Sequence, residues 1–295
     1  MRKLFYISLL FIMTNSIWAQ HSTLTSNYLF NLFAVNPAYA GQRKALDVSA
    51  FYRKQWAGLA GAPQTTCLMG SLEIKPKNLS LGFIYENDRI GLTSVNNLKV
   101  ALSYRIKIDR KKTIAFGVMP SYQRIYYDWS KLRTTTQGDE TFMLTSPVIN
   151  KFNTAAGVFY YTKKMYAGLS SPEMLNFNSG KWYVELNFVG GYVYKVNDNI
   201  TLKPSILVRE IKNSPVQVDL NLTTYINEIL GVGLAYRNKD AIVAYFDCVL
   251  DRRFKIGYAY DLSVGQLRRY NSGTHEVMLN YYFGKLSNAP TPRFF

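Results

Sequence analysis

The stretch WYVELNFVGGYVYKV, residues 182–196, shows the clearest alternation of apolar and polar residues in the chain. Its even positions, from Trp182 to Val196, are almost all apolar or aromatic, whereas its odd positions include Glu185, Asn187 and Lys195. Successive side chains of a β-strand point to opposite faces. The alternation therefore predicts one long strand with an apolar face and a polar face.

The same period of two recurs along the chain, and we expect about fourteen strands. Many of them are about nine to twelve residues long, close to the length that a tilted membrane strand needs. The expected strands cover residues 46–55, 64–73, 79–86, 95–107, 113–124, 152–161, 164–170, 182–196, 199–209, 215–225, 229–237, 241–249, 253–261 and 274–283.

The connections between these strands alternate in length. Tight turns are expected at 74–78, 108–112, 162–163, 197–199 and 250–252, and longer links at 56–63, 87–94, 125–151, 171–181 and 262–273, with the short link 238–240 as an exception. Short turns at one end and long loops at the other are typical of outer-membrane barrels. We therefore expect an all-β protein, a transmembrane antiparallel β-barrel over residues 46–283, with aromatic residues suited to the membrane interface at its end, Tyr281 to Phe283. A soluble sandwich would also alternate, but it would leave a very large apolar surface exposed.

The two ends of the chain have other expected roles. Arg2 and Lys3 precede the short apolar run Leu4 to Ile12, and small residues then lead to a cleavage site after Ala19 or Gln20. This is the pattern of a secretory signal peptide, residues 1–19, so we expect the chain to be exported. Export together with the expected barrel predicts the cell outer membrane as its location. Residues 20–45 are expected to form a periplasmic plug or cap, and residues 284–295 a periplasmic tail.

Composition limits the chemistry and the partners. The formal charge is +16, yet the sequence contains no basic helix and no nucleic-acid module, so we expect anionic lipid or acidic protein as partners and no nucleic acid. Two cysteines, Cys67 and Cys248, and two histidines are too few for a metal site of the usual kind, and we expect no metal and no cofactor. Basic residues gather in four expected turns, at Lys75 and Lys77, Arg110 to Lys112, Lys163 and Lys164, and Arg252 and Arg253.

Two N-terminal motifs add a family resemblance. Residues 31–41 read NLFAVNPAYAG, with Asn36, Pro37, Tyr39 and Gly41, and residues 53–65 read RKQWAGLAGAPQT, with Arg53, Gln55, Trp56, Gly58, Gly61 and Pro63. Together with GLSSPEMLN at 168–176 and SGTHEV at 272–277, they resemble the PorP/SprF family of outer-membrane proteins, in order over essentially the whole mature chain.

The resemblance implies a place beside the type IX secretion and gliding-motility machinery. Proteins of this family are thought to help export or anchor specific partners, such as cell-surface adhesins, and to contact periplasmic components. The resemblance therefore identifies the secretion system better than it identifies the cargo protein.

Three groups of residues are candidates for contact. The segment 20–43, with its turn held by Asn36, is expected to enter the periplasmic mouth as a plug or to form a cap without a gating role. Trp56, Gly58 and Gly61 suggest either an extracellular contact surface or an interfacial tryptophan beside a tight loop. The loop 125–151, with Tyr126, Tyr127 and Trp129, is the strongest candidate for cargo contact, since interfaces favour aromatic anchors.

Two other function classes compete with this interpretation. An enzyme needs an activated nucleophile or a positioned base, but alternation places His275 on the apolar face and Glu276 on the lumen face, so we expect no enzyme. A FadL-like channel for small hydrophobic molecules also carries an Asn-Pro-Ala plug, which Asn36-Pro37-Ala38 echoes, but it needs an apolar lumen. The inward positions expected here are charged with both signs: Lys99, Arg105, Glu185, Lys195, Lys203, Arg209, Asp219, Arg237, Lys255 and Glu276.

Overall fold

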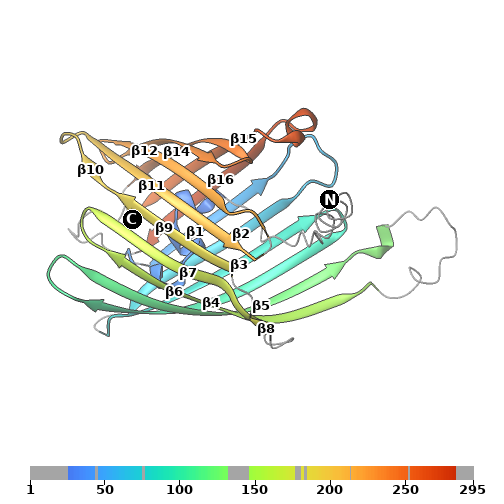
Figure 1. Cartoon of the computed structure of the whole chain (residues 1–295), viewed down its shortest axis with the longest axis horizontal. Helices are drawn as coiled ribbons and strands as arrows, with labels where there is room; N and C mark the ends of the chain where they lie inside the picture. Colours follow the sequence, from blue (N-terminus) through green and yellow to red (C-terminus); the bar gives the residue numbers. More distant parts are fainter. Residues whose placement is uncertain are drawn as a thin grey trace, which may run out of the picture.

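The computed structural model is a closed antiparallel β-barrel (Figure 1). It describes residues 26–43, 46–74, 77–131, 146–176, 181–182, 185–212, 214–251 and 253–283. The expected signal peptide and the expected C-terminal tail lie outside these residues. The ring is closed at two places. At the first, β1 (Leu46–Lys54) pairs with both β16 (Thr274–Phe283) and β2 (Gln64–Ile74). At the second, β9 (Glu185–Tyr192) pairs with both β7 (Met165–Asn176) and β11 (Ile200–Ile211).

The described residues form sixteen strand elements, but three of them occupy the position of a single strand between β7 and β11. These are β8 (Lys181–Trp182), β9 and β10 (Tyr194–Lys195), which follow one another along the chain. The wall therefore contains fourteen strands, as the alternation predicts. The other strands are β3 (Leu79–Ile90), β4 (Thr93–Lys107), β5 (Thr113–Tyr127), β6 (Val148–Tyr161), β12 (Gln217–Ile226), β13 (Leu230–Arg237), β14 (Ala241–Asp251) and β15 (Phe254–Ser263).

Three expected loops are partly strand. In the predicted loop 171–181, β7 continues to Asn176 and β8 begins at Lys181. The predicted loop 87–94 is wrong, because β3 and β4 continue until only Gly91 and Leu92 separate them. The predicted loop 125–151 is shortened at both ends by β5 and β6, which extend beyond the rest of the barrel at the right of Figure 1. A polar side chain such as that of Asn87 does not end the strand, because the Asn87 amide donates to Asn96 on the paired strand β4 at 2.9 Å.

The two faces of the wall divide as the alternation predicts. Apolar side chains point outward around the ring, and most of the charged positions expected inside are buried: Arg105, Glu185, Lys203, Arg209, Asp219, Arg237, Lys255 and Glu276. Lys99 is half-buried, and Lys195 is exposed, contrary to expectation. The wall strand breaks at Val193, whose N–H donates to the Lys164 carbonyl at 2.6 Å, and Lys195 turns instead to Asp198 in the neighbouring turn, at 2.8 Å.

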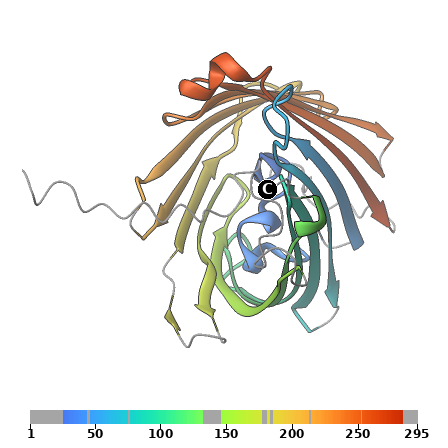
Figure 2. The same cartoon turned by 90° about the vertical axis from the view of Figure 1, so that its right-hand side faces the viewer.

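The N-terminal segment 26–43, here called the plug, lies inside the barrel (Figure 2). It forms three short 3-10 helices, η1 (Asn27–Leu29), η2 (Leu32–Ala34) and η3 (Pro37–Tyr39). Nearly all of its residues are buried. The plug thus supplies the hydrophobic core that an empty barrel would lack.

None of the helices in the described residues is long and apolar enough to cross a bilayer. Cys67 and Cys248 are free thiols. Cys67 lies in the core on β2, whereas Cys248 is half-buried on β14.

Candidate functional site

The third helix of the plug is held by Asn36. This side chain caps η3, since its Oδ1 accepts the Ala38 N–H at 2.9 Å. Its Nδ2 donates to the carbonyls of Val158 at 3.0 Å and Leu169 at 3.4 Å, on β6 and β7. A side chain that caps a helix normally stabilises only that helix. Here the same side chain also fixes the helix to the wall.

A row of small residues forms the floor beneath η3. Ser103, Gly117, Gly157 and Ser170 are consecutive partners in the register of β4, β5, β6 and β7. A Cβ at Gly117 would overlap the backbone of Ala38, and one at Gly157 would overlap the Asn36 side chain. The two serines donate to plug carbonyls, Ser103 to Ala38 at 3.1 Å and Ser170 to Val35 at 2.6 Å. The wall is therefore shaped to receive backbone at this position.

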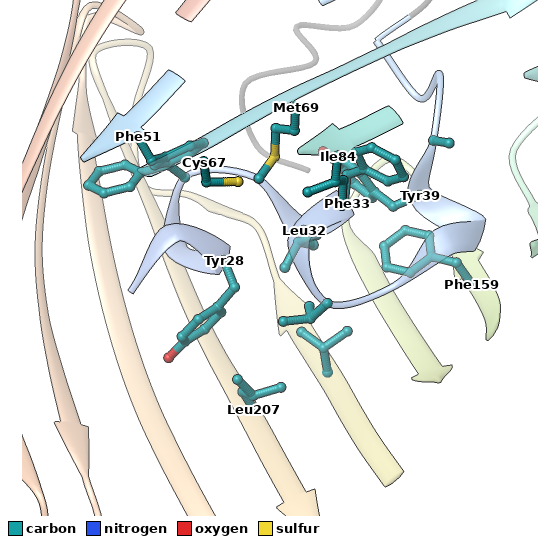
Figure 3. Packing of buried hydrophobic residues seen from close by; sticks show 14 of the residues in the cluster. Tyr28, Leu32, Phe33, Tyr39, Phe51, Cys67, Met69, Ile84, Phe159 and Leu207 are labelled. Atoms are coloured by element: carbon teal, nitrogen blue, oxygen red, sulfur yellow. The ribbon is translucent and has the colours of Figure 1, made fainter. Parts of the chain in front are cut away.

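Apolar and aromatic side chains fill the space around the plug (Figure 3). Tyr39 meets the ring of Phe159 edge-on, with centroids 5.3 Å apart, and Phe30 meets Tyr245 edge-on at 6.1 Å. Two cavities beside η1 and η2 measure about 10 Å³ each. A cavity of this size holds about one water molecule. The plug consequently packs against the wall as a protein core does.

The first residue of the plug that the structure describes, Ser26, enters a buried cluster of charges. Its N–H donates to Glu276 at 3.0 Å, and its hydroxyl donates to Asp261 at 3.1 Å. Arg53 bridges the same two carboxylates, with guanidinium–oxygen distances of 2.9 Å to Glu276 and 3.0 Å to Asp261. All four residues are buried.

Arg237 on β13 extends this cluster to Asp219 on β12. It contacts Asp261 at 3.3 Å and Asp219 at 3.1 Å, and it donates to the Ser26 hydroxyl at 3.3 Å. Tyr28 donates to Asp219 at 2.8 Å. Five wall strands, β1, β12, β13, β15 and β16, thus meet the plug in one ion-paired network, which we call the tip cluster: Ser26, Tyr28, Arg53, Asp219, Arg237, Asp261 and Glu276.

The base of the plug is fixed at the short-turn end. The Gly41 carbonyl accepts from Arg105 at 2.8 Å, and Gly41 has a positive φ of 67°. Arg43 contacts Asp47 at 3.4 Å and lies over the Tyr282 ring at 5.2 Å. The plug therefore runs along the lumen from this end to the tip cluster near the long-loop end, and it is not confined to one mouth.

The connection 55–63, here called the rim loop, lies at the long-loop end. Gln55 donates to the Pro63 carbonyl at 2.9 Å, closing the base of the loop. Trp56, Gly58 and Gly61 all have positive φ, at 47°, 93° and 73°. Glycine adopts this region without strain, whereas Trp56 is placed there by a hydrogen bond from its N–H to Thr274 Oγ1 at 3.1 Å.

The three aromatic residues of the predicted cargo loop lie apart. Tyr126 and Tyr127 are adjacent on β5 and so point to opposite faces of the sheet, Tyr126 being exposed and Tyr127 half-buried. Trp129 begins η4 (Trp129–Lys131), and its N–H donates to Ser146 at 3.1 Å. They form no single patch, although all three lie at the long-loop end.

Other predicted features lie outside the lumen. His275 is on the outer face, where its Nδ1 is 2.7 Å from the Tyr258 hydroxyl, and Glu276 is in the lumen, as expected. The basic turns lie at the short-turn end, although Lys75 and Arg252 are outside the described residues. In one of these turns the N–H groups of Lys111 and Lys112 donate to Asp109 and hold the pKa of its carboxyl below the usual value.

The predicted site residues therefore fall into three groups: the plug residues with Arg53, the rim-loop residues, and Tyr126, Tyr127 and Trp129 at the long-loop end. Asn36, Pro37, Tyr39 and Gly41 are plug residues, and Arg53 joins them in the lumen, apart from its neighbours in the 53–65 motif. Sequence reasoning missed Ser26 and the partnership of Asp261 with Arg53 and Arg237. It also missed the glycine floor, for which inward-facing glycines in otherwise regular strands were an available signal. Among the described residues, no group of three or more His, Cys, Asp or Glu side chains is placed to hold a metal ion.

Solved structures similar to this chain include a channel, a transporter and a porin. The CymD monoaromatic hydrocarbon channel has a TM-score of 0.51 at 9% identity, with 90% of this chain and 95% of that chain covered. The P. putida toluene transporter TodX has a TM-score of 0.48 at 9% identity, covering 85% and 93%, and the KdgM porin 0.41 at 10%, covering 81% and 99%. At such low identity the likeness to CymD shows the barrel fold alone. No curated protein has a matching sequence.

The family profile described as "Type IX secretion system membrane protein PorP/SprF" matches residues 17–281. That range includes both N-terminal motifs, the plug and every strand except the last residues of β16. The chain therefore belongs to the PorP/SprF family of type IX secretion system membrane proteins.

Proposed function

We propose that this barrel is an accessory of the type IX secretion and gliding machinery that supports export or surface anchoring of specific partner proteins, such as adhesins. Family membership supports the association with type IX secretion, and the barrel fold with that membership implies the outer membrane. The observation that carries the proposal is the filled lumen. A segment buried between charged and aromatic wall residues favours a protein that presents surfaces to partners over one that conducts a solute.

Surfaces at both ends are suited to partners. At the long-loop end the β5–β6 extension exposes Tyr126 and Phe152, and aromatic side chains are enriched in protein interfaces. At the short-turn end, exposed Lys111, Lys112 and Lys163 offer positive charge to an acidic periplasmic protein. One end is thus suited to cargo and the other to the secretion machinery.

Deleting the gene and comparing the surface and secreted proteomes with wild type tests the proposal. We expect one or a few large surface proteins to disappear while general secretion continues. Complementation with a barrel in which Tyr126 and Phe152 are both replaced by serine should leave the barrel in the membrane but lower the surface level of the same proteins. Replacement of Leu169, an outward residue of the membrane wall, by valine is the matched control.

An unchanged surface proteome would remove this proposal and favour the alternative, a channel for small hydrophobic molecules. The paired charges of the lumen speak against that alternative, because an apolar solute would have to pass the buried tip cluster.

We also infer that the protein is not an enzyme. Its strand-borne histidine, His275, is engaged with Tyr258 on the outer face, while Glu276 is ion-paired with Arg53 in the lumen. A base and an acid on opposite faces of one strand cannot act on one substrate. Ester or peptide hydrolysis by the purified barrel that His275→Ala abolishes would overturn this inference.

A further inference from the structure

Two cations stand side by side on the outer face of the wall below the rim loop. Lys54, Gln64 and Arg89 are consecutive partners in the register of β1, β2 and β3. All three side chains are exposed and point away from the lumen. Since neighbouring strands are about 4.8 Å apart, the Cα atoms of the two cations are separated by about 10 Å. Both long side chains can therefore reach one ligand over Gln64.

These cations are not neutralised within the part of the chain that the structure describes. Neither Lys54 nor Arg89 has an ion pair or a side-chain hydrogen bond there. The nearest acidic residues along the strands, Asp88 and Glu276, point into the lumen, where Asp88 accepts from Thr65 at 2.8 Å and Glu276 binds Arg53. The outer face at this height is therefore positive.

A hollow lies between the cations and the rim loop. It measures about 520 Å³ and is lined by Lys54, Gln64, Arg89, Gly91 and rim-loop residues 58–62. The rim-loop wall is Gly-Leu-Ala-Gly-Ala, and these mostly small side chains leave space above the cations. The volume lies within the roughly 300–1,000 Å³ of typical small-molecule sites.

The rim loop is fixed from both sides. The Ala57 N–H donates to Gly273 at 2.8 Å, and Ser272 donates back to Ala57 at 2.8 Å. On the other side Gly91 donates to Gly61 at 2.9 Å. A wall held in this way is formed before a ligand arrives, which lowers the entropic cost of binding.

The hollow stands at the height of lipid head groups. Two residues farther from the rim loop on the same outer face, Tyr52 on β1 is exposed and Asn87 on β3 is half-buried. The next outward residues, Leu68 on β2 and Tyr85 on β3, begin the apolar surface. Aromatic residues of barrels gather at the membrane interface, and long loops face the cell exterior. The cations thus face the outer leaflet at its polar boundary.

We propose that this hollow binds the phosphorylated head group of an outer-leaflet glycolipid of the lipid A type. Arg89 and Lys54 supply charge-assisted hydrogen bonds to phosphate, and the space under the rim loop accommodates the sugar. The acyl chains then run down the apolar wall past Leu68. The size of the hollow and its position on the lipid side favour a lipid head group over a free phosphate ion.

Lipid binding to the purified full-length barrel in detergent tests the proposal. Bisphosphorylated lipid A, its dephosphorylated form and inorganic phosphate are the probes, and native mass spectrometry counts the ligands retained. We expect one tightly held lipid A per barrel. The double variant Lys54→Gln with Arg89→Gln should bind it at least about tenfold more weakly, because each lost charged hydrogen bond costs a factor of this order. Ala60→Trp, which fills the hollow without changing charge, should weaken binding too.

The control is Arg268→Gln with Arg269→Gln, which removes two exposed cations of η5 (Gln266–Tyr270) outside the hollow. Heat-modifiable electrophoretic mobility shows that each variant is folded. The proposal fails if the control loses as much lipid as the double variant, or if dephosphorylated lipid A binds equally well. Displacement of lipid A by millimolar inorganic phosphate would assign the site to the free ion instead.

Discussion

At the scale of single residues, the tip cluster places several charges out of water. Arg53 pairs with two carboxylates, Asp261 and Glu276. Asp261 also contacts Arg237 at 3.3 Å, whereas Arg53 is the cation that pairs with Glu276 among the described residues. Removing one partner of a buried ion pair leaves an uncompensated charge, which costs about 3–5 kcal/mol. We expect Arg53→Met to lower the free energy of unfolding by about this amount, as measured by urea titration of the barrel in lipid vesicles. Arg268→Met, at an exposed position, should have little effect; equal effects would mean that the cluster contributes no stability.

Asn36 is a second residue whose side chain acts beyond its own helix. Asn36→Ala removes the η3 cap and both hydrogen bonds to the wall strands. Loss of a cap alone costs about 1 kcal/mol, so we expect a loss of about 2 kcal/mol in the free energy of unfolding. Asn31→Ala is the matched control, because Asn31 caps η2 by accepting the Phe33 N–H at 3.1 Å and its side chain makes no hydrogen bond to the described part of the wall. A loss no larger than that of the control would show that the bonds to β6 and β7 contribute nothing.

At the scale of elements, the plug and the glycine floor are complementary surfaces. Gly157→Val places a branched side chain where Asn36 now lies, so we expect η3 to leave the floor and the plug to loosen. Accessibility of the plug to protease in the folded, detergent-solubilised barrel measures this. Gly190→Val is the control, because a Cβ at Gly190 has its nearest neighbour at 3.5 Å and meets only ordinary contacts. Unchanged protection of the plug in Gly157→Val would show that the floor tolerates side chains.

The outer strands of the β5–β6 extension illustrate why element lengths were underestimated. Sequence patterns end a membrane strand where apolar alternation stops, because only the membrane imposes that alternation. Where the apolar alternation stops, strands continue with hydrogen bonds between polar side chains, as Tyr122 with Asn150 at 2.8 Å on β5 and β6 and Asn87 with Asn96 on β3 and β4 show. Boundaries at the short-turn end were therefore predicted to within a few residues, whereas β3, β5, β6 and β7 continue beyond their predicted ends at the long-loop end.

At the scale of the whole molecule, the barrel depends on the plug to fill its lumen. A wall of fourteen strands encloses a lumen too wide for its own side chains to fill. Deleting residues 26–43 should therefore open a water-filled path, which planar-bilayer recording detects as stepwise conductance absent from the wild type. The folded state of the variant is checked by heat-modifiable mobility. A wild-type barrel that conducts as well as the deletion variant would show that the plug does not close the lumen.

The features of the barrel wall could be predicted from the sequence. Strand number, the division into outward apolar and inward charged faces, and the alternation of turns and loops follow from local patterns, because a side chain's face is fixed by its parity within a strand. The turn at Asn36 was equally local, since a capping side chain acts on the residues that follow it. The main exception was the break at Val193. Beyond an interrupted strand, odd and even positions no longer indicate the face, so Lys195 was wrongly placed in the lumen.

The way the lumen is filled could not be predicted from the sequence, because it depends on contacts between residues far apart in the chain. Ser26 and Glu276 are 250 residues apart in sequence, and Arg53 and Asp261 are 208 apart, so no local pattern relates them. They meet because the ring closes between β1 and β16 and the plug threads the lumen beside that closure. Lys54, Gln64 and Arg89 became one positive face in the same way, through the register of three strands. Alternation tells which side of the wall a residue faces, whereas register and closure decide which residues it meets there.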